Sequence, residues 1–151
     1  MNKASKEALY KACLNYAQSR VDNANTALEE TQNSTNQETR STAGDKHDTA
    51  RAMMHIESER LSKQLADAQR LRRNIKSVDI TGKHTQIKSG SLVKTDAGTF
   101  FLAISIGKLE VEDLSYFVIS PGSPMGQVLI GAKLNDVVIF NGKSIKIRDI
   151  C

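Results

Sequence analysis

Glycine and proline are nearly confined to the second half of the chain. Residues 1–81 contain one glycine and no proline, whereas residues 82–151 contain eight glycines and both prolines. Since glycine and proline mark turns and interrupt helices, long helices are expected only in the first half. Five of the seven aromatic residues lie in the second half, where they favour a half-buried sheet. The sequence therefore predicts an α+β protein whose helical and β-rich parts meet near residues 78–84.

Apolar residues in the first half recur at alternating steps of three and four, the spacing of a coiled-coil seam. The two ladders are Tyr10, Leu14, Ala17, Val21, Ala24 and Leu28, and then Ala50, Met54, Glu57, Leu61, Gln64, Ala68, Leu71 and Ile75. Residues 31–45, between the ladders, contain no large apolar side chain. The pattern predicts an antiparallel coiled-coil hairpin over residues 1–78, with its tip at about 35–48 and arms about 45 Å long.

Charge is distributed unevenly along this hairpin. Residues 29–59 carry seven acids and three bases, residues 60–76 carry six bases and one acid, and residues 1–28 carry four bases and two acids. An antiparallel hairpin places residues 1–28 beside residues 60–76, so its base is basic and its tip is acidic. Carboxylates gathered at a tip repel one another and favour a cation or a basic partner.

Two groups of charged residues are candidate sites. Asp45 and Asp48 lie three residues apart on one face, where they either hold a cation or complement the helix dipole as first-turn acids. The second group consists of the bases Arg70, Arg72, Arg73 and Lys76. These bases either bind phosphate or form a solvated helix face. His47 and His55 have no cysteine or helically spaced histidine beside them, so a zinc site is not expected.

The second half is predicted to form a four- to six-stranded antiparallel sheet that wraps one short helix, in a domain at residues 79–151. Ser123 caps a helix over residues 125–129, which has Pro124 at its first position and ends at Gly131. Asn141-Gly142 is the strongest short signal for a hairpin turn. Strands are expected at residues 86–95, 99–106, 116–120, 137–140 and 144–150, and residues 107–113 are expected to be a charged connection.

Several classes of protein are excluded by what the sequence lacks. It has no apolar run of about 18 residues, no secretory h-region, and no nucleotide loop, nucleophile elbow or zinc-protease motif. Cys13 and Cys151 make neither a disulfide framework nor a ligand spacing, so Cys13 is expected to be a small buried residue. A soluble cytoplasmic protein that does not bind membranes is expected.

The helical hairpin followed by this β domain resembles the bacterial Gre transcript cleavage factors. Their β domain carries Ser-Pro-x-x-x-x-Leu-(Ile/Leu)-Gly-Lys-x-x-x-Asp, which this chain matches at Ser123, Pro124, Leu129, Ile130, Gly131 and Asp136, with Ala132 standing before Lys133. Their hairpin tip reads Gly-Asp-Leu-(Lys/Arg)-Glu-Asn-Ala-Glu-Tyr. Residues 44–52 match that tip at Gly44, Asp45 and Ala50, and by charge at Asp48. The resemblance spans nearly the whole chain in architecture and length.

The resemblance implies a transcription elongation factor that is not itself an enzyme. Such a factor inserts its hairpin into the secondary channel of a backtracked RNA polymerase and stimulates transcript cleavage by the polymerase. The tip carboxylates, here Asp45 and Asp48, would help to hold a second Mg²⁺ in the polymerase active site, which is two-metal phosphodiester hydrolysis. The implied factor is a monomer with no tightly bound cofactor, and it touches DNA at most indirectly.

The same resemblance assigns the other candidate residues. The basic group Arg70, Arg72, Arg73 and Lys76 would contact phosphates of the nascent RNA 3′ segment. The β domain, similar in fold to FK506-binding proteins (FKBP-like), would dock on the channel rim near Ser123 and Pro124.

The tip of this chain departs from the family pattern. Asp48 is one methylene shorter than glutamate, Lys46 replaces leucine, Thr49 replaces asparagine and Arg51 replaces glutamate. A non-cleaving regulator that occupies the secondary channel is therefore the main alternative function. A peptidyl-prolyl isomerase, which the absence of tryptophan disfavours, and a plain dimerisation module are two further hypotheses.

Overall fold

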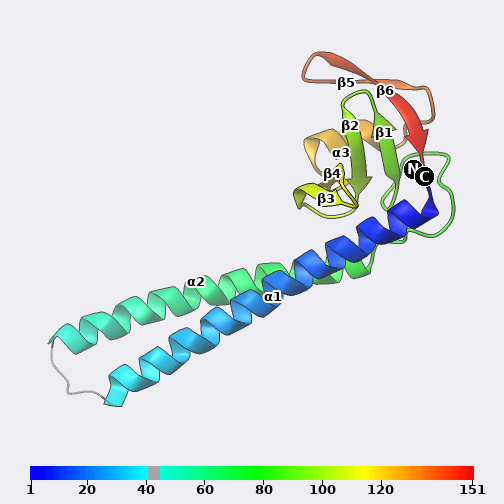
Figure 1. The fold of residues 1–151 in the computed structure, drawn as a ribbon. Helices are drawn as coiled ribbons and strands as arrows, with labels where there is room; N and C mark the ends of the chain where they lie inside the picture. Colours follow the sequence, from blue (N-terminus) through cyan, green and yellow to red (C-terminus); the bar gives the residue numbers. More distant parts are fainter. Residues whose placement is uncertain (41–44) are drawn as a thin grey trace. The chain divides into compact units, whose positions relative to one another are not determined.

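The computed structural model describes the backbone of residues 1–40 and 45–151 and the side chains of residues 1–34 and 48–151 (Figure 1). Within these residues the fold is α+β, as predicted: two long packed helices, then a six-stranded, mostly antiparallel sheet with one short helix. The chain forms two compact units, one made of Met1–Leu14 with Asn74–Cys151 and the other of Asn15–Arg73. No helix of the described part has the length and apolar character needed to cross a membrane.

Helices α1 (Lys3–Arg40) and α2 (Asp45–Lys76) form the predicted hairpin. In the unit Asn15–Arg73 the buried seam consists of Ala17, Val21, Ala24, Leu61 and Ala68. The arms are also tied by a hydrogen bond of 3.2 Å from the Arg72 guanidinium to Gln18 Oε1. Gln64, which the ladder places in the seam, is exposed, and Leu65 is half-buried instead.

The first turns of α1 bury a different face from the predicted one. Leu9 and Cys13 are fully buried, whereas Tyr10 and Leu14 are only half-buried. These turns belong to the compact unit that also contains the sheet. The spacing of a coiled coil, which considers only contacts between two helices, is therefore not sufficient to predict which of their side chains are buried. The coiled-coil ladder is therefore wrong by one position at this end, and the prediction that Cys13 is buried is confirmed.

The six strands lie in the order β3-β4-β2-β1-β6-β5. Neighbouring strands are antiparallel except β2 and β4, which pair in parallel with Phe100 opposite Phe117. This parallel pair was not predicted. The strands are β1 (Leu92–Thr95), β2 (Gly98–Leu102), β3 (Gly107–Val111), β4 (Leu114–Ile119), β5 (Val137–Phe140) and β6 (Lys143–Ile150).

The prediction that residues 107–113 form a connection is wrong, because they contain edge strand β3. Lys108 and Glu110 are exposed, while Leu109 and Val111 are half-buried, which is the alternation of a strand with one solvated face. Residues 86–91 are likewise not a regular strand, since Gln86 makes a single bridge to Lys133.

Helix α3 (Pro124–Leu129) packs its buried side chains, Met125 and Leu129, into the core of the sheet. The β5–β6 hairpin turns at Asn141 and Gly142, whose φ values of 50° and 76° are those of the predicted two-residue turn. The other buried residues of the core cluster that contains Met125 and Leu129 are Ile87, Val93, Phe100, Leu102, Ala132, Ile145, Ile147 and Ile150.

Candidate functional site

Of the two predicted tip carboxylates, the structure describes the side chain of Asp48 only. Asp45 is the first residue of α2, and its side chain lies outside the described residues, as do those of Lys46 and His47. Asp48, one turn along α2, has an exposed side chain. Arg51, at the next i,i+3 position, is exposed as well. The start of α2 thus presents a carboxylate to solvent with a guanidinium three residues further along the same helix.

Carboxylate oxygens at this position fit Mg²⁺, which proteins commonly hold through one or two carboxylates together with water and substrate phosphates. Among the side chains that the structure describes, no group of three or more His, Cys, Asp or Glu residues is placed to hold a metal ion.

The four predicted RNA-contacting bases differ in their availability. Arg73 and Lys76 are exposed, and Arg70 is exposed with a guanidinium nitrogen 3.5 Å from an Asp67 carboxylate oxygen. Arg72 is half-buried and donates its hydrogen bond across the hairpin to α1. Three of the four bases thus face solvent along the last turns of α2, whereas Arg72 serves to hold the two helices together.

Ser123 and Pro124 open α3 in the way the sequence predicts. The Ser123 hydroxyl accepts a hydrogen bond of 3.0 Å from the Gly126 amide and donates one of 2.7 Å to the Ser120 carbonyl. Pro124 stands at the start of the helix, where its missing N–H costs nothing, and it is exposed. The serine is thus occupied in capping, and of the two residues the proline is the one open to a partner.

Two further residues, Asp136 and Gly131, have structural roles in the segment that follows α3. Asp136 accepts a hydrogen bond of 2.8 Å from the Lys133 amide, which closes the turn before β5. Gly131 has a φ of +85°, which favours glycine, and its amide donates to the Ile87 carbonyl at 2.8 Å. These contacts account for both residue types without a ligand.

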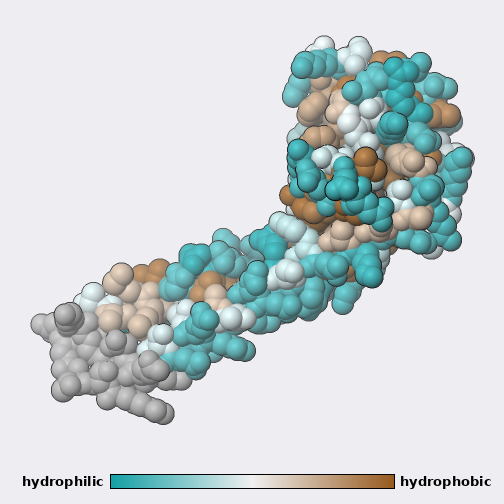
Figure 2. Space-filling view, in the orientation of Figure 1, coloured by the Kyte–Doolittle hydropathy of each residue, from teal (hydrophilic) through white to brown (hydrophobic). Residues whose placement is uncertain are grey.

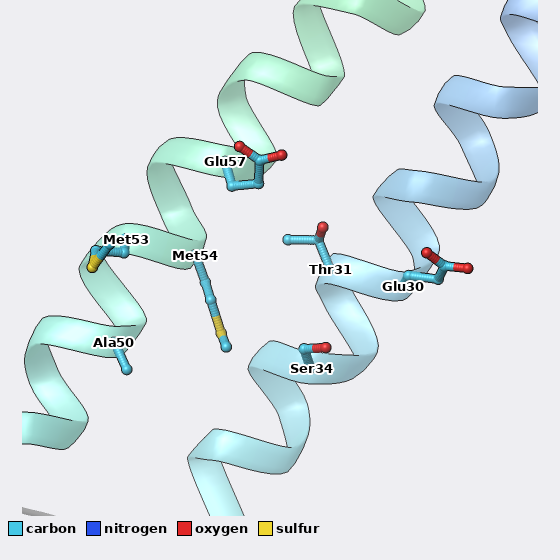
Figure 3. Close-up of a pocket in the computed structure, with 7 residues that line it drawn as sticks. All are labelled: Glu30, Thr31, Ser34, Ala50, Met53, Met54 and Glu57. Atoms are coloured by element: carbon cyan, nitrogen blue, oxygen red, sulfur yellow. The ribbon is translucent and has the colours of Figure 1, made fainter.

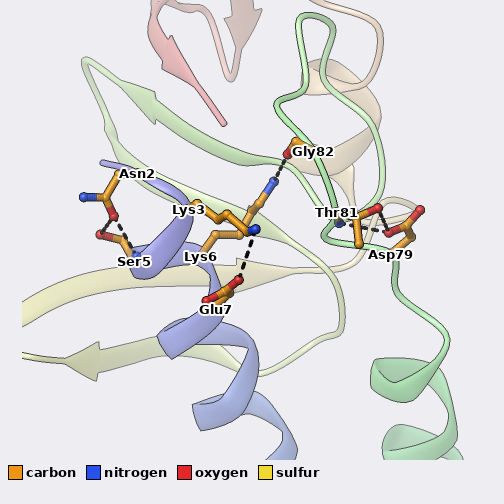
Figure 4. Close-up of polar contacts among 8 residues, drawn as sticks. All are labelled: Asn2, Lys3, Ser5, Lys6, Glu7, Asp79, Thr81 and Gly82. Carbon is orange, nitrogen blue, oxygen red and sulfur yellow. Dashed lines mark hydrogen bonds and ion pairs between the residues drawn. The ribbon is translucent and has the colours of Figure 1, made fainter.

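A buried polar cluster that the sequence did not predict joins the start of α1 to the segment after α2. Lys6 is fully buried, and its Nζ donates a hydrogen bond of 3.0 Å to the Gly82 carbonyl (Figure 4). His84 is also buried, with Nδ1 2.7 Å from Ser91 Oγ and Nε2 3.3 Å from the Thr81 carbonyl. Because a carbonyl only accepts, Nε2 carries the proton and Nδ1 accepts from the serine hydroxyl.

Burial lowers the pKa of both basic side chains in this cluster, Lys6 and His84. Loss of solvation lowers the pKa of Lys6, although Cys151 and Asp79 oppose that shift. Loss of solvation also lowers the pKa of His84, and the nearby charge of Lys6 adds to the effect. The one sequence signal for the cluster is the position of Lys6, three residues before Leu9 on the face that proves to be buried. The cluster ties α1 to the chain that follows α2, so its role is structural.

No family model matches the sequence, and no curated protein matches it. Among the described residues, an exposed carboxylate lies near the start of α2, exposed bases lie at the end of the same helix, and an exposed proline lies at the start of α3.

Proposed function

We propose that this protein is a Gre-like transcription elongation factor that inserts the tip of its hairpin into the secondary channel of RNA polymerase and stimulates cleavage of backtracked transcripts. The observation that carries the proposal is a two-helix hairpin whose distal half, over residues 29–59, has a net charge of −4 and whose last 17 residues of α2 have a net charge of +5. A spacer or dimerisation arm does not require such a polarity.

The order of the structural parts supports the same proposal. A long antiparallel hairpin precedes a small mixed sheet with one capped helix, which is the architecture of the Gre-like factors that the sequence resembles. In this proposal the sheet domain is FKBP-like and docks on the channel rim through the loop at Pro124. The protein acts as a monomer, in the cytoplasm, where bacterial polymerase is found.

The tip contributes charge and position. A second Mg²⁺, when bound in the polymerase site, stabilises the charge that develops on the oxygens of the scissile phosphodiester. Asp45 and Asp48 would offer carboxylate oxygens to that ion from consecutive turns of one helix. Because the helix holds them at its first two turns, their approach to the active site is set by the depth to which the hairpin enters.

The exposed bases contribute binding. Arg70, Arg73 and Lys76 lie at steps of three along the solvated side of α2, so they can follow the phosphates of an extruded RNA strand. Such contacts neutralise phosphate charge without reading sequence, which suits a factor that acts at many pauses. Arg72 would help indirectly by keeping the hairpin closed through Gln18.

One observation favours a non-cleaving channel regulator as the second candidate function. Arg51 is exposed at i+3 from Asp48, where the family resemblance would place a glutamate. A base at this spacing attracts the neighbouring carboxylate and competes with a cation for it. The same hairpin would then occupy the channel without supplying an effective metal ligand.

A cleavage assay on a backtracked complex of purified bacterial RNA polymerase separates the two functions. The wild-type protein should shorten the transcript 3′ end, and Asp45→Asn with Asp48→Asn should abolish that stimulation. The matched control, Glu110→Gln with Asp113→Asn on the sheet domain, removes the same charge and should leave cleavage unchanged. Stimulation that survives the tip substitutions would show the cleavage mechanism to be wrong. If the wild-type protein instead competes with a cleavage factor and cleaves nothing itself, the non-cleaving regulator is correct.

A further inference from the structure

The distal half of the hairpin contains an open groove between its two helices. On the α2 side Ala50, Met53 and Met54 line it, and on the α1 side Thr31 and Ser34 do so, enclosing a volume of about 530 Å³ (Figure 3). Met54 points from α2 toward α1, while Met53 lies on the outer side of α2.

The groove follows from the sequence of α1. Through Ala24 the seam offers buried apolar residues, but at Thr31 and Ser34 it offers short polar ones. On the α1 side the groove is lined by Glu30, Thr31 and Ser34, so no large apolar side chain of α1 is among its lining residues. The two helices do not close their interface at this level, which leaves thioether and methyl groups accessible.

Two apolar side chains of α2 are exposed beside the groove: Met53, which lines it, and Ile56, which does not. Met53 is 66% exposed and Ile56 is 67% exposed, one turn apart. Figure 2 shows apolar colour along α2 next to the grey end of the hairpin, whereas hydrophilic colour dominates further along both helices. A surface helix normally turns such residues inward, so a contiguous exposed group marks a site of interaction.

The border of the groove is acidic. Glu30 points away from α2 on the α1 side, and Glu57 lies on the α2 side, where its carboxylate pairs with Arg60. The neighbouring described residues, 27–34 and 48–60, include five acidic and two basic side chains. An apolar groove with this border repels phosphate, and so it suits neither a nucleic acid nor an anionic membrane. It suits a protein surface with apolar anchors flanked by lysine or arginine.

We propose that the exposed apolar surface formed by Met53 and Ile56, at the α2 edge of this groove (the Met53–Ile56 surface), is a docking site for a basic amphipathic helix of a partner protein. Methionine adapts to varied apolar anchors, and helices with side chains at i, i+3 and i+4 commonly bind such grooves. The docking does not depend on the tip carboxylates, so it holds for either form of the proposed function.

A second copy of this chain is a poorer occupant. Its own basic helical segment, residues 60–76, has no exposed large apolar side chain that could fill the groove. The exposed large apolar residues elsewhere in the described part lie at Met1 and on the sheet domain, outside any basic helix. The partner must therefore combine positive charge and apolar anchors in one helix, which this chain does not do.

The test measures binding of a dye-labelled 18-residue helical peptide made of leucine and lysine, with leucine on one face, to the full chain by fluorescence anisotropy. Met53→Ser with Ile56→Ser should weaken binding by about 10- to 100-fold, as expected for withdrawing two large apolar contacts. The matched control Val137→Ser with Ile139→Ser removes side chains that are 58% and 68% exposed on the sheet domain, and it should change binding by less than about twofold. A peptide with glutamate in place of lysine should bind at least about 10-fold more weakly.

Three binding results contradict the proposal. Absence of binding, equal weakening by both pairs of substitutions, or unchanged binding by the Met53/Ile56 variant would each overturn it. Self-association in sedimentation that the Met53/Ile56 substitutions abolish would also overturn it, by assigning the groove to a second copy. Circular dichroism should show wild-type helicity in both variants, because all four replaced side chains are largely exposed. If the wild-type protein binds the peptide but does not stimulate transcript cleavage, the proposed cleavage function is wrong and the docking site is still supported.

Discussion

Replacing Cys13 by alanine should change how the stability of the protein depends on pH. The thiol is fully buried on α1, and burial raises its pKa from the ordinary 9.0 to about 12. In the unfolded chain the thiol is hydrated and loses its proton near the ordinary value. Above pH 9 the unfolded state is therefore deprotonated while the folded state still holds the proton. The stabilising contribution of Cys13 is complete below pH 9 and is lost as the pH rises toward 12.

The size of the effect follows from the linkage relation. Each pH unit between the two pKa values costs the folded state about 1.4 kcal/mol, so the wild-type protein should lose about 2 kcal/mol from this group between about pH 9 and about pH 10.5. At about pH 7 the alanine variant should be about 1–1.5 kcal/mol less stable, because a buried sulfur and its contacts are removed. The two proteins should therefore become equally stable near about pH 10, and the variant should be the more stable of the two at about pH 10.5.

Urea unfolding followed by helical circular dichroism under reducing conditions, at about pH 7, 9 and 10.5, measures this difference. Other groups titrate in the same range, but they do so in both proteins and cancel in the comparison. Gly122→Ala is the control, because it changes no titratable group and its added Cβ meets nothing within 4 Å, so its difference from wild type should not change with pH. A Cys13→Ala difference that stays constant across this pH range would refute the reasoning that burial governs this thiol.

Two further substitutions test other parts of the fold. Gly126→Ala should destabilise the protein by about 2–4 kcal/mol in urea unfolding, because the added Cβ would lie 2.3 Å from the Ser120 carbonyl oxygen. Gly122→Ala meets nothing within 4 Å and should cost less than about 0.5 kcal/mol, so equal losses would contradict this account. Lys6→Met should remove the part of the pH dependence that comes from the lowered pKa of Lys6. The free energy of unfolding of the wild type should increase relative to that of the variant as the pH rises toward about 10.5, because Lys6 keeps its proton to higher pH in the unfolded chain than in the folded one. A difference that does not change with pH would contradict this prediction.

Local signals predicted those parts of the fold that are stabilised locally. The β5–β6 hairpin forms where Asn141-Gly142 supplies two positive φ values, and α3 begins where Ser123 supplies a cap. Both features depend on a few consecutive residues. The absence of glycine and proline from the first arm of the hairpin is equally visible in the sequence.

The wrong predictions concern features that are determined by contacts between distant parts of the chain. Strand β3 was missed because, as an edge strand, its charged residues face solvent and only Leu109 and Val111 turn partly inward. The parallel pairing of β2 with β4 joins strands that are not consecutive, so no turn signal marks it. At the start of α1 the buried face is shifted by one position, to Leu9 and Cys13, in the part of the helix that belongs to the same compact unit as the sheet.

The candidate site divides in the same way. Exposure of Asp48 and of the bases at the end of α2 follows from their place on a solvated helix face, and the sequence predicts it. The use of Arg72 as a bridge to α1 depends on the register of the two helices, which hydrophobic spacing leaves undefined. The groove beside Met54 likewise depends on which α1 residues lie across from α2, namely Thr31 and Ser34.

The two proposed activities of the hairpin depend on different kinds of interaction, so substitutions at the tip should affect them differently. Delivery of a carboxylate to a metal requires correct placement within fractions of an ångström, so a base such as Arg51 beside Asp48 is enough to weaken it. The proposed docking at Met53 and Ile56 would require only accessible apolar surface, so it would tolerate such changes. If both proposals are correct, a hairpin that cannot stimulate cleavage because of its tip residues would still bind its partner, which is the behaviour expected of the non-cleaving regulator.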